Sequence, residues 1–110
     1  MAVGIDNYRL EKWSDRSLRS RSDLIAQMRS EGYDVFEWRD EPGAAYPDHQ
    51  HDDYQSHWVI SGTLEFTVAG VGTFEMREGD RDFMPTGTIH SARVIGNEPV
   101  EYLIGSRPAV

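Results

Sequence analysis

The segment GAAYPDHQHDDYQSHWVISG, residues 43–62, decides how this chain is expected to fold. It contains three of the four histidines, His49, His51 and His57, with the carboxamide of Gln55 among them. Side chains alternate between the two faces of a β-strand, so His49 and His51 on a strand would point the same way, about 6.5–7 Å apart. Both imidazoles could then contact one ion.

The fourth histidine follows a second patterned segment, GDRDFMPTGTIH, residues 79–90. The Gly-Asp start and the Pro-x-Gly sequence predict a strand, a sharp turn and a second strand that begins at His90. The sequence therefore predicts that two distant parts of the chain deliver imidazole nitrogens to one place.

These two segments resemble the two motifs of the cupin superfamily. The first motif, G-x5-H-x-H-x3,4-E-x6-G, is matched at Gly43, His49, His51 and Gly62, with Gln55 at the glutamate position. The second motif, G-x5-P-x-G-x2-H-x3-N, is matched at Gly79, Pro85, Gly87 and His90, with Val94 at the asparagine position. Two motifs that match together are a more specific signal than either one alone.

The resemblance implies an all-β fold, a single-domain double-stranded β-helix (jelly-roll) barrel with a metal ion held inside. It also implies a homodimer, as is common among small cupins. The metal ligands carried over from the motifs are His49, His51, Gln55 and His90.

Length and composition agree with one small folded domain. The chain has 110 residues, 38% of them hydrophobic and none of them cysteine, so we expect a single core and a cytoplasmic protein without disulfides. No apolar run is long enough to span a bilayer. The formal charge of −8 argues against nucleic acid as a partner. All but one of the basic residues are arginine, which suits carboxylate recognition, so an acidic small molecule is not excluded.

The order of elements follows from local patterns. Residues 1–32 are expected to form an N-terminal region, with an extended arm over residues 1–12 that lies along the barrel or against a second subunit. A short helix over Ser20 to Glu31 follows, with a capping box at Ser20 and Asp23. Residues 33–110 are expected to form the barrel. About seven strands are predicted, at 33–38, 55–60, 63–68, 73–77, 80–84, 89–95 and 100–104. Ser61 and Gly62 are expected to form a tight hairpin turn between the second and third of these.

The fourth protein ligand has two candidates. Gln55 would complete a neutral set of three imidazoles and one amide oxygen, which favours Fe²⁺, Ni²⁺, Cu²⁺ or Zn²⁺ over Mn²⁺. His57 shares the inward face with Gln55 by strand alternation. It could instead be the fourth ligand, stand beside the metal as a general base or substrate contact, or be a neutral imidazole hydrogen-bonded in the core.

Two classes of function fit these residues. One is a metal-dependent enzyme with dioxygenase, isomerase or lyase chemistry on a small oxygen-rich or acidic molecule, with His57, Tyr54 and Tyr102 as candidate catalytic groups. The other is a non-catalytic module that binds a metabolite or the metal alone. An open metal position and a proton-transfer group in the pocket would indicate the enzyme.

Overall fold

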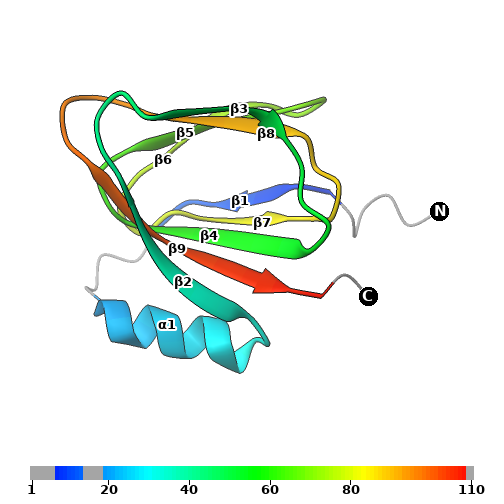
Figure 1. Cartoon of the computed structure of the whole chain (residues 1–110). Coiled ribbons are helices and arrows are strands. Elements are labelled where there is room, and N and C mark those ends of the chain that lie inside the picture. Colours follow the sequence, from blue (N-terminus) through cyan, green and yellow to red (C-terminus); the bar gives the residue numbers. More distant parts are fainter. Residues whose placement is uncertain (1–6, 14–18, 109–110) are drawn as a thin grey trace.

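The computed structural model describes residues 7–13 and 19–108. Within them the chain forms one helix and nine strands (Figure 1). The elements are β1 (Arg9–Glu11), α1 (Arg21–Ser30), β2 (Asp34–Asp40), β3 (Ala45–His49), β4 (Tyr54–Ser61), β5 (Leu64–Val68), β6 (Gly72–Met76), β7 (Arg81–Met84), β8 (His90–Val94) and β9 (Val100–Arg107). No helix in the described part of the chain is long and apolar enough to cross a membrane.

The strands form two antiparallel sheets that face each other, which confirms the predicted jelly-roll fold (Figure 1). One sheet has the order β1-β7-β4-β9-β2, and the other has the order β3-β8-β5-β6. Apolar side chains from both sheets, including Val59, Leu64, Phe66 and Val100, form one core between them. Because the core fills only part of this space, the remainder is available for a site.

The two faces of strand β4 contact different parts of the molecule. Gln55 and His57 both line a cavity inside the barrel, as their shared parity predicts. Trp58 points to the opposite face, where it packs with Leu24 and Met28 of α1 in a second core. One strand therefore contributes side chains both to the interior and to the helix contact.

The expected hairpin at Ser61 and Gly62 is wrong. Strand β4 pairs with β7 and β9, whereas β5 pairs with β6 and β8, so the chain crosses from one sheet to the other at this point. Gly62 has a φ of 81°, and a Cβ there would lie 2.4 Å from the carbonyl oxygen of Pro99. The glycine is therefore needed for a close crossing of two chain segments.

The described part of the N-terminal arm lies along the barrel. Residues Arg9–Glu11 form strand β1, which pairs with β7 at the edge of the five-stranded sheet. Residues 1–6 of the predicted arm lie outside the described residues. Three residues are too few to show a strand pattern, and their pairing partners lie 70 to 74 positions away along the chain.

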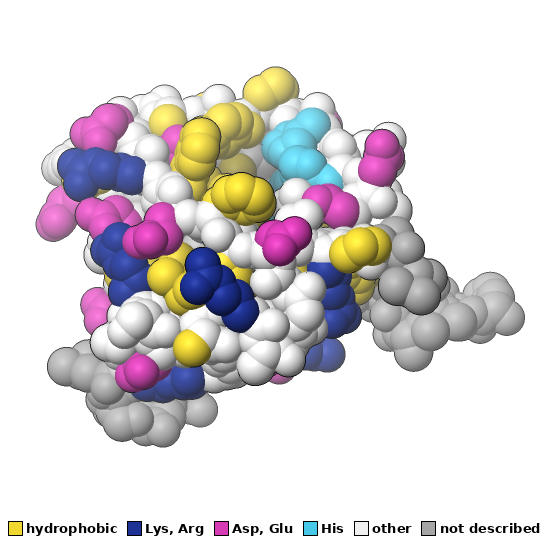
Figure 2. All heavy atoms as spheres, turned by 60° about the horizontal axis from the view of Figure 1, so that its bottom comes forward, with side chains coloured by type: hydrophobic (Ala, Val, Ile, Leu, Met, Phe, Trp, Pro, Cys, Tyr) yellow, Lys and Arg dark blue, Asp and Glu magenta, His cyan; other side chains and the backbone are white. Residues whose placement is uncertain are grey.

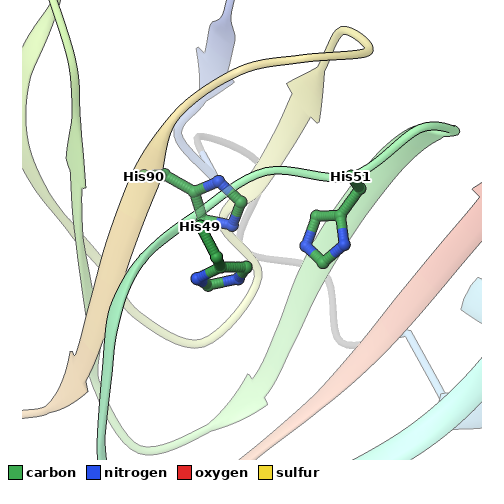
Figure 3. Close-up of side chains that lie close together, drawn as sticks. All are labelled: His49, His51 and His90. Atoms are coloured by element: carbon green, nitrogen blue, oxygen red, sulfur yellow. The ribbon is translucent and has the colours of Figure 1, made fainter.

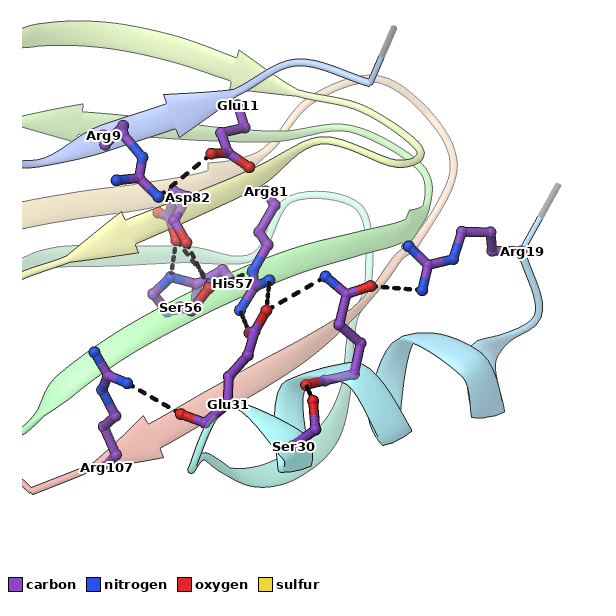
Figure 4. Close-up of polar contacts among 11 residues, drawn as sticks. Arg9, Glu11, Arg19, Ser30, Glu31, Ser56, His57, Arg81, Asp82 and Arg107 are labelled. Carbon is purple, nitrogen blue, oxygen red and sulfur yellow. Dashed lines mark hydrogen bonds and ion pairs between the residues drawn. The ribbon is translucent and has the colours of Figure 1, made fainter. Parts of the chain in front are cut away.

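Helix α1 has the predicted capping box, in which the Ser20 side chain accepts a hydrogen bond from the Asp23 amide. The helix is fixed to the sheet at its C-terminal end, where the Glu31 carboxylate forms an ion pair with Arg81 at 2.6 Å (Figure 4). Arg81 is almost fully buried and also donates to the hydroxyl of Ser56. This marginal helix is therefore held by packing and by one partly buried ion pair.

Candidate metal centre

Three histidines from both motifs meet at one point inside the barrel. His49 ends β3, His51 follows it in a loop, and His90 begins β8. Their ligand nitrogens all lie within 4.8 Å of one another (Figure 3). The ring centroids of His49 and His90 are 4.2 Å apart, and those of His49 and His51 are 4.9 Å apart. The prediction that separated segments bring imidazoles together is confirmed.

The local reason for the approach of His49 and His51 differs from the predicted one. Strand β3 ends at His49, and its register against β8 is irregular between Tyr46 and His49. His51 therefore lies beyond the strand, and strand alternation does not position it. Instead, the backbone amide of Gly87 donates to the carbonyl of His51 at 2.9 Å, which ties this loop to the turn before His90.

Two of the three imidazoles are oriented by backbone carbonyls. His49 Nδ1 donates to the carbonyl of Pro47 at 2.7 Å, and His90 Nδ1 donates to the carbonyl of Thr88 at 2.9 Å. A donating Nδ1 leaves Nε2 with its lone pair free. Backbone acceptors of this kind commonly fix the tautomer of metal-binding histidines.

Burial favours the neutral form of two of the three imidazoles, those of His90 and His51. Burial, reinforced by the nearby histidines, lowers the pKa of His90 to about 4, although the hydrogen bond to Thr88 opposes the shift. Burial and the neighbouring His49 also lower the pKa of His51. At neutral pH the lone pairs are therefore available without loss of a proton, and the donor set fits a divalent transition metal.

Gln55 is placed as a further candidate ligand. It is buried and lines the same cavity as the three histidines. Its Nε2 donates to Asp53 Oδ1 at 3.2 Å, which leaves its amide oxygen as the remaining polar atom. Asp53 is itself fixed by a hydrogen bond from the Ser106 hydroxyl. This arrangement orients the carboxamide of Gln55 as carboxylates orient metal-binding imidazoles in other sites.

If Gln55 is a ligand, Gln55→Glu should shift metal preference toward Mn²⁺. A carboxylate oxygen suits a hard ion better than an amide oxygen, so the ratio of the Mn²⁺ and Zn²⁺ dissociation constants should fall by about tenfold. Competitive metal titration measures this ratio. Gln50→Glu is the matched control, because Gln50 is exposed and does not line the cavity. An unchanged ratio in Gln55→Glu would show that Gln55 does not bind the ion.

His57 lies outside the three-histidine cluster. It is buried, and its Nδ1 is 2.8 Å from Oδ1 of Asp82, which also accepts the backbone amide of His57 (Figure 4). Asp82 is fully buried and receives a third hydrogen bond from the hydroxyl of Tyr8. A proton on Nδ1 leaves Nε2 as the free nitrogen of an imidazole that lines the cavity.

The two tyrosines predicted as catalytic candidates are placed differently. Tyr102 lines the cavity, and its hydroxyl donates to Asp40 at 2.7 Å. Tyr54 is not among the cavity-lining residues; its ring packs beside Tyr33 and under the guanidinium of Arg107. Only Tyr102 is therefore near the histidines.

The cavity has a volume of about 220 Å³ and opens to the surface. In Figure 2 the histidines lie on one side of a hollow and hydrophobic side chains lie on the other. The lining residues are Trp38, Tyr46, His49, His51, Gln55, His57, Phe66, His90, Ala92, Tyr102 and Ile104. The candidate metal centre thus forms one wall of a small, mostly apolar pocket.

Sequence reasoning missed two acidic residues beside this pocket, Asp40 and Asp82. Asp82 lies in the middle of the short buried strand β7 and is fully inaccessible. A charged residue in a buried strand needs a partner, so an aspartate inside the predicted strand 80–84 was a signal that the sequence contained. Its partners, His57 and Tyr8, are too distant along the chain to be found from local patterns.

Comparisons with known proteins agree with this geometry. A family model described as Cupin domain matches residues 36–105. Oxalate decarboxylase from Bacillus subtilis is similar at 29% identity over 67% of this chain and 21% of that chain, with a TM-score of 0.60. A protein from Klebsiella pneumoniae with a double-stranded β-helix domain is similar at 26% identity over 68% of this chain and 66% of that chain, also with a TM-score of 0.60.

A structure of DMSP lyases has a TM-score of 0.65 at 23% identity, over 72% of this chain and 40% of that chain, and shows the fold alone. The chain spans about a fifth of the length of the oxalate decarboxylase that it resembles. No curated protein matches the sequence.

Proposed function

The chain belongs to the cupin family, and from this premise we propose that it holds one divalent transition-metal ion and acts on a small oxygen-bearing molecule. The observation that carries the proposal is the convergence of three imidazoles, from His49, His51 and His90, with their ligand nitrogens within 4.8 Å of one another. Similar cupin structures belong to metal-dependent proteins; the Bacillus subtilis oxalate decarboxylase, for example, has Mn(II) centres.

The residues present determine which ions fit. Imidazole nitrogens suit Fe²⁺, Ni²⁺, Cu²⁺ and Zn²⁺, and the sequence places no negatively charged ligand at the glutamate position of the motif, where Gln55 stands. When bound, such an ion supplies a positive charge that polarises ligand oxygens and stabilises negative charge developing on them. Metal-dependent dioxygenase, isomerase and lyase reactions all fit this description.

The chain also offers a group that can hold a proton beside the histidine cluster. Asp82 fixes the His57 ring through Nδ1 at 2.8 Å, so Nε2 remains for the cavity. An imidazole held in one tautomer by a buried carboxylate is suited to accept a proton, and the carboxylate stabilises the imidazolium that results. The ring centroids of Phe66 and His57 are 5.0 Å apart, so Phe66 restricts the movement of the imidazole further.

A test of catalysis against simple binding is whether the ion keeps an exchangeable position. Protein loaded with Cu²⁺ should change its visible absorption when azide is added, because an enzyme needs an open position for its substrate. Protein stripped of copper is the control. An unchanged spectrum of the stoichiometric copper protein would favour the alternative, a non-catalytic module with a closed coordination sphere.

A further inference from the structure

The cavity beside the candidate metal centre is lined largely by aromatic and aliphatic side chains. These are Trp38, Tyr46, Phe66, Ala92, Tyr102 and Ile104. Within the described part of the chain, no lysine or arginine lines the cavity. A dicarboxylate would therefore find no cationic side chain to pair with, although recognition of such a ligand commonly relies on arginine.

Several polar side chains of the cavity are instead hydrogen-bonded to carboxylates. Asp40 accepts hydrogen bonds from the hydroxyls of Tyr102 and Tyr46, at 2.7 and 2.5 Å. Asp53 accepts from Gln55, and Asp82 accepts from His57. Three carboxylates thus stand behind the polar lining groups, where they offset part of the positive charge that a bound metal ion would bring and so weaken its attraction for an anionic ligand.

The hydroxyls of Tyr46 and Tyr102 are not free to bind a ligand, because both donate to Asp40. The hydrogen bond to Asp40 and partial burial raise the pKa of Tyr46. Burial, together with the Asp40 carboxylate, raises the pKa of Tyr102. Both hydroxyls therefore stay protonated and remain committed to Asp40, which leaves their rings as the surface that a ligand meets.

The most exposed lining residues mark the opening. Trp38 is 50% exposed and Tyr46 is 37% exposed, whereas Phe66 and His90 are buried. Trp38 Nε1 donates to Asp40 Oδ1 at 3.2 Å, so the indole is fixed by the same carboxylate that fixes both tyrosines. A rigid aromatic wall of this kind favours a flat apolar ligand through ring contacts.

We propose that the ligand of this site is an uncharged aromatic ring compound with hydroxyl or carbonyl oxygens at one edge, and not a dicarboxylate. The ring would lie against Trp38 and Tyr46, and the oxygens would face the three histidines. This inference rests on the proposed metal site. It narrows the expected oxygen-rich or acidic molecule to a neutral one, and a cavity of about 220 Å³ limits it to a small molecule.

Isothermal titration of the zinc-loaded protein with catechol and with oxalate tests the inference. Both probes offer two oxygens to a metal, but catechol is a neutral ring and oxalate is a dianion without a ring. Catechol should bind at least tenfold more tightly. Equal or tighter binding of oxalate, or no binding of catechol, would overturn the inference.

The aromatic wall is tested by Trp38→Ala, which should weaken catechol binding by about three- to tenfold and leave zinc content unchanged. Because the indole is half exposed, the folded state should tolerate this change. Phe36→Ala is the matched control, because Phe36 is an exposed aromatic on the same strand that does not line the cavity. Equal catechol affinity in wild type and Trp38→Ala would contradict the assigned role.

Zinc stoichiometry, measured first on each protein, distinguishes a wrong ligand class from a wrong metal site. A protein with one zinc ion per chain that prefers oxalate overturns the ligand class and leaves the metal site intact. A protein that fails to retain zinc overturns the proposed function itself.

Discussion

Replacing His90 with alanine is expected to reduce affinity for a divalent transition metal by more than about 100-fold. Loss of a residue that only orients a metal ligand already costs about 10- to 100-fold, and His90 supplies a donor nitrogen directly. His51→Ala should have an effect of the same order, because its nitrogen belongs to the same cluster. Isothermal titration with Zn²⁺, supported by elemental analysis of the purified proteins, measures the loss.

His57→Gln is the control for this experiment. His57 is a buried histidine that lines the same cavity but lies outside the cluster. Its replacement should leave zinc affinity within about threefold of wild type, since neither a ligand nor a ligand-orienting hydrogen bond is removed. Stoichiometric, tightly bound zinc in both His51→Ala and His90→Ala would refute the three-histidine site.

Replacing Asp82 with alanine is expected to lower the free energy of unfolding by about 3–5 kcal/mol. The carboxylate is fully buried and accepts hydrogen bonds from the His57 amide, the His57 imidazole and the Tyr8 hydroxyl. Its removal leaves the two buried donors of His57 and the partly buried Tyr8 hydroxyl without their acceptor, and each then costs desolvation free energy. Because a small domain has a total stability of about 5–15 kcal/mol, this change would bring the protein close to unfolding.

Urea denaturation at pH 7 measures this loss, and Asp82→Asn provides the matched comparison. An asparagine has nearly the same shape and keeps one oxygen acceptor, so it should recover a large part of the stability lost in Asp82→Ala. Equal stability of wild type and Asp82→Ala would show that Asp82 does not hold His57 and Tyr8 as described. That result would also remove the physical basis for a fixed His57 tautomer.

The histidines of the site could be identified because each motif is a short, local pattern of turn-forming residues and histidines. That His49, His51 and His90 meet followed from the joint resemblance to the two cupin motifs, and the structure confirms it. The capping box at Ser20 and Asp23 is equally local, since both partners lie within one helical turn. These features depend on short-range geometry, which the order of residues records directly.

Features that depend on distant partners could not be predicted. A glycine turn that closes a hairpin and one that carries the chain between sheets look alike in sequence, so the sequence predicts the wrong kind of connection at Gly62. The hydrogen bond from Tyr8 to Asp82 joins residues 74 positions apart, and that from Tyr102 to Asp40 joins residues 62 positions apart. Only the folded arrangement of strands brings such pairs together.

The most direct test of the account is a crystal structure of the zinc-loaded protein, with the ion located by anomalous diffraction at the zinc edge. A three-histidine zinc site predicts one anomalous peak per chain, about 2.0–2.1 Å from a ring nitrogen of each of His49, His51 and His90. A peak at any other place in the chain, or a cluster without an ion in protein that contains stoichiometric zinc, would contradict it.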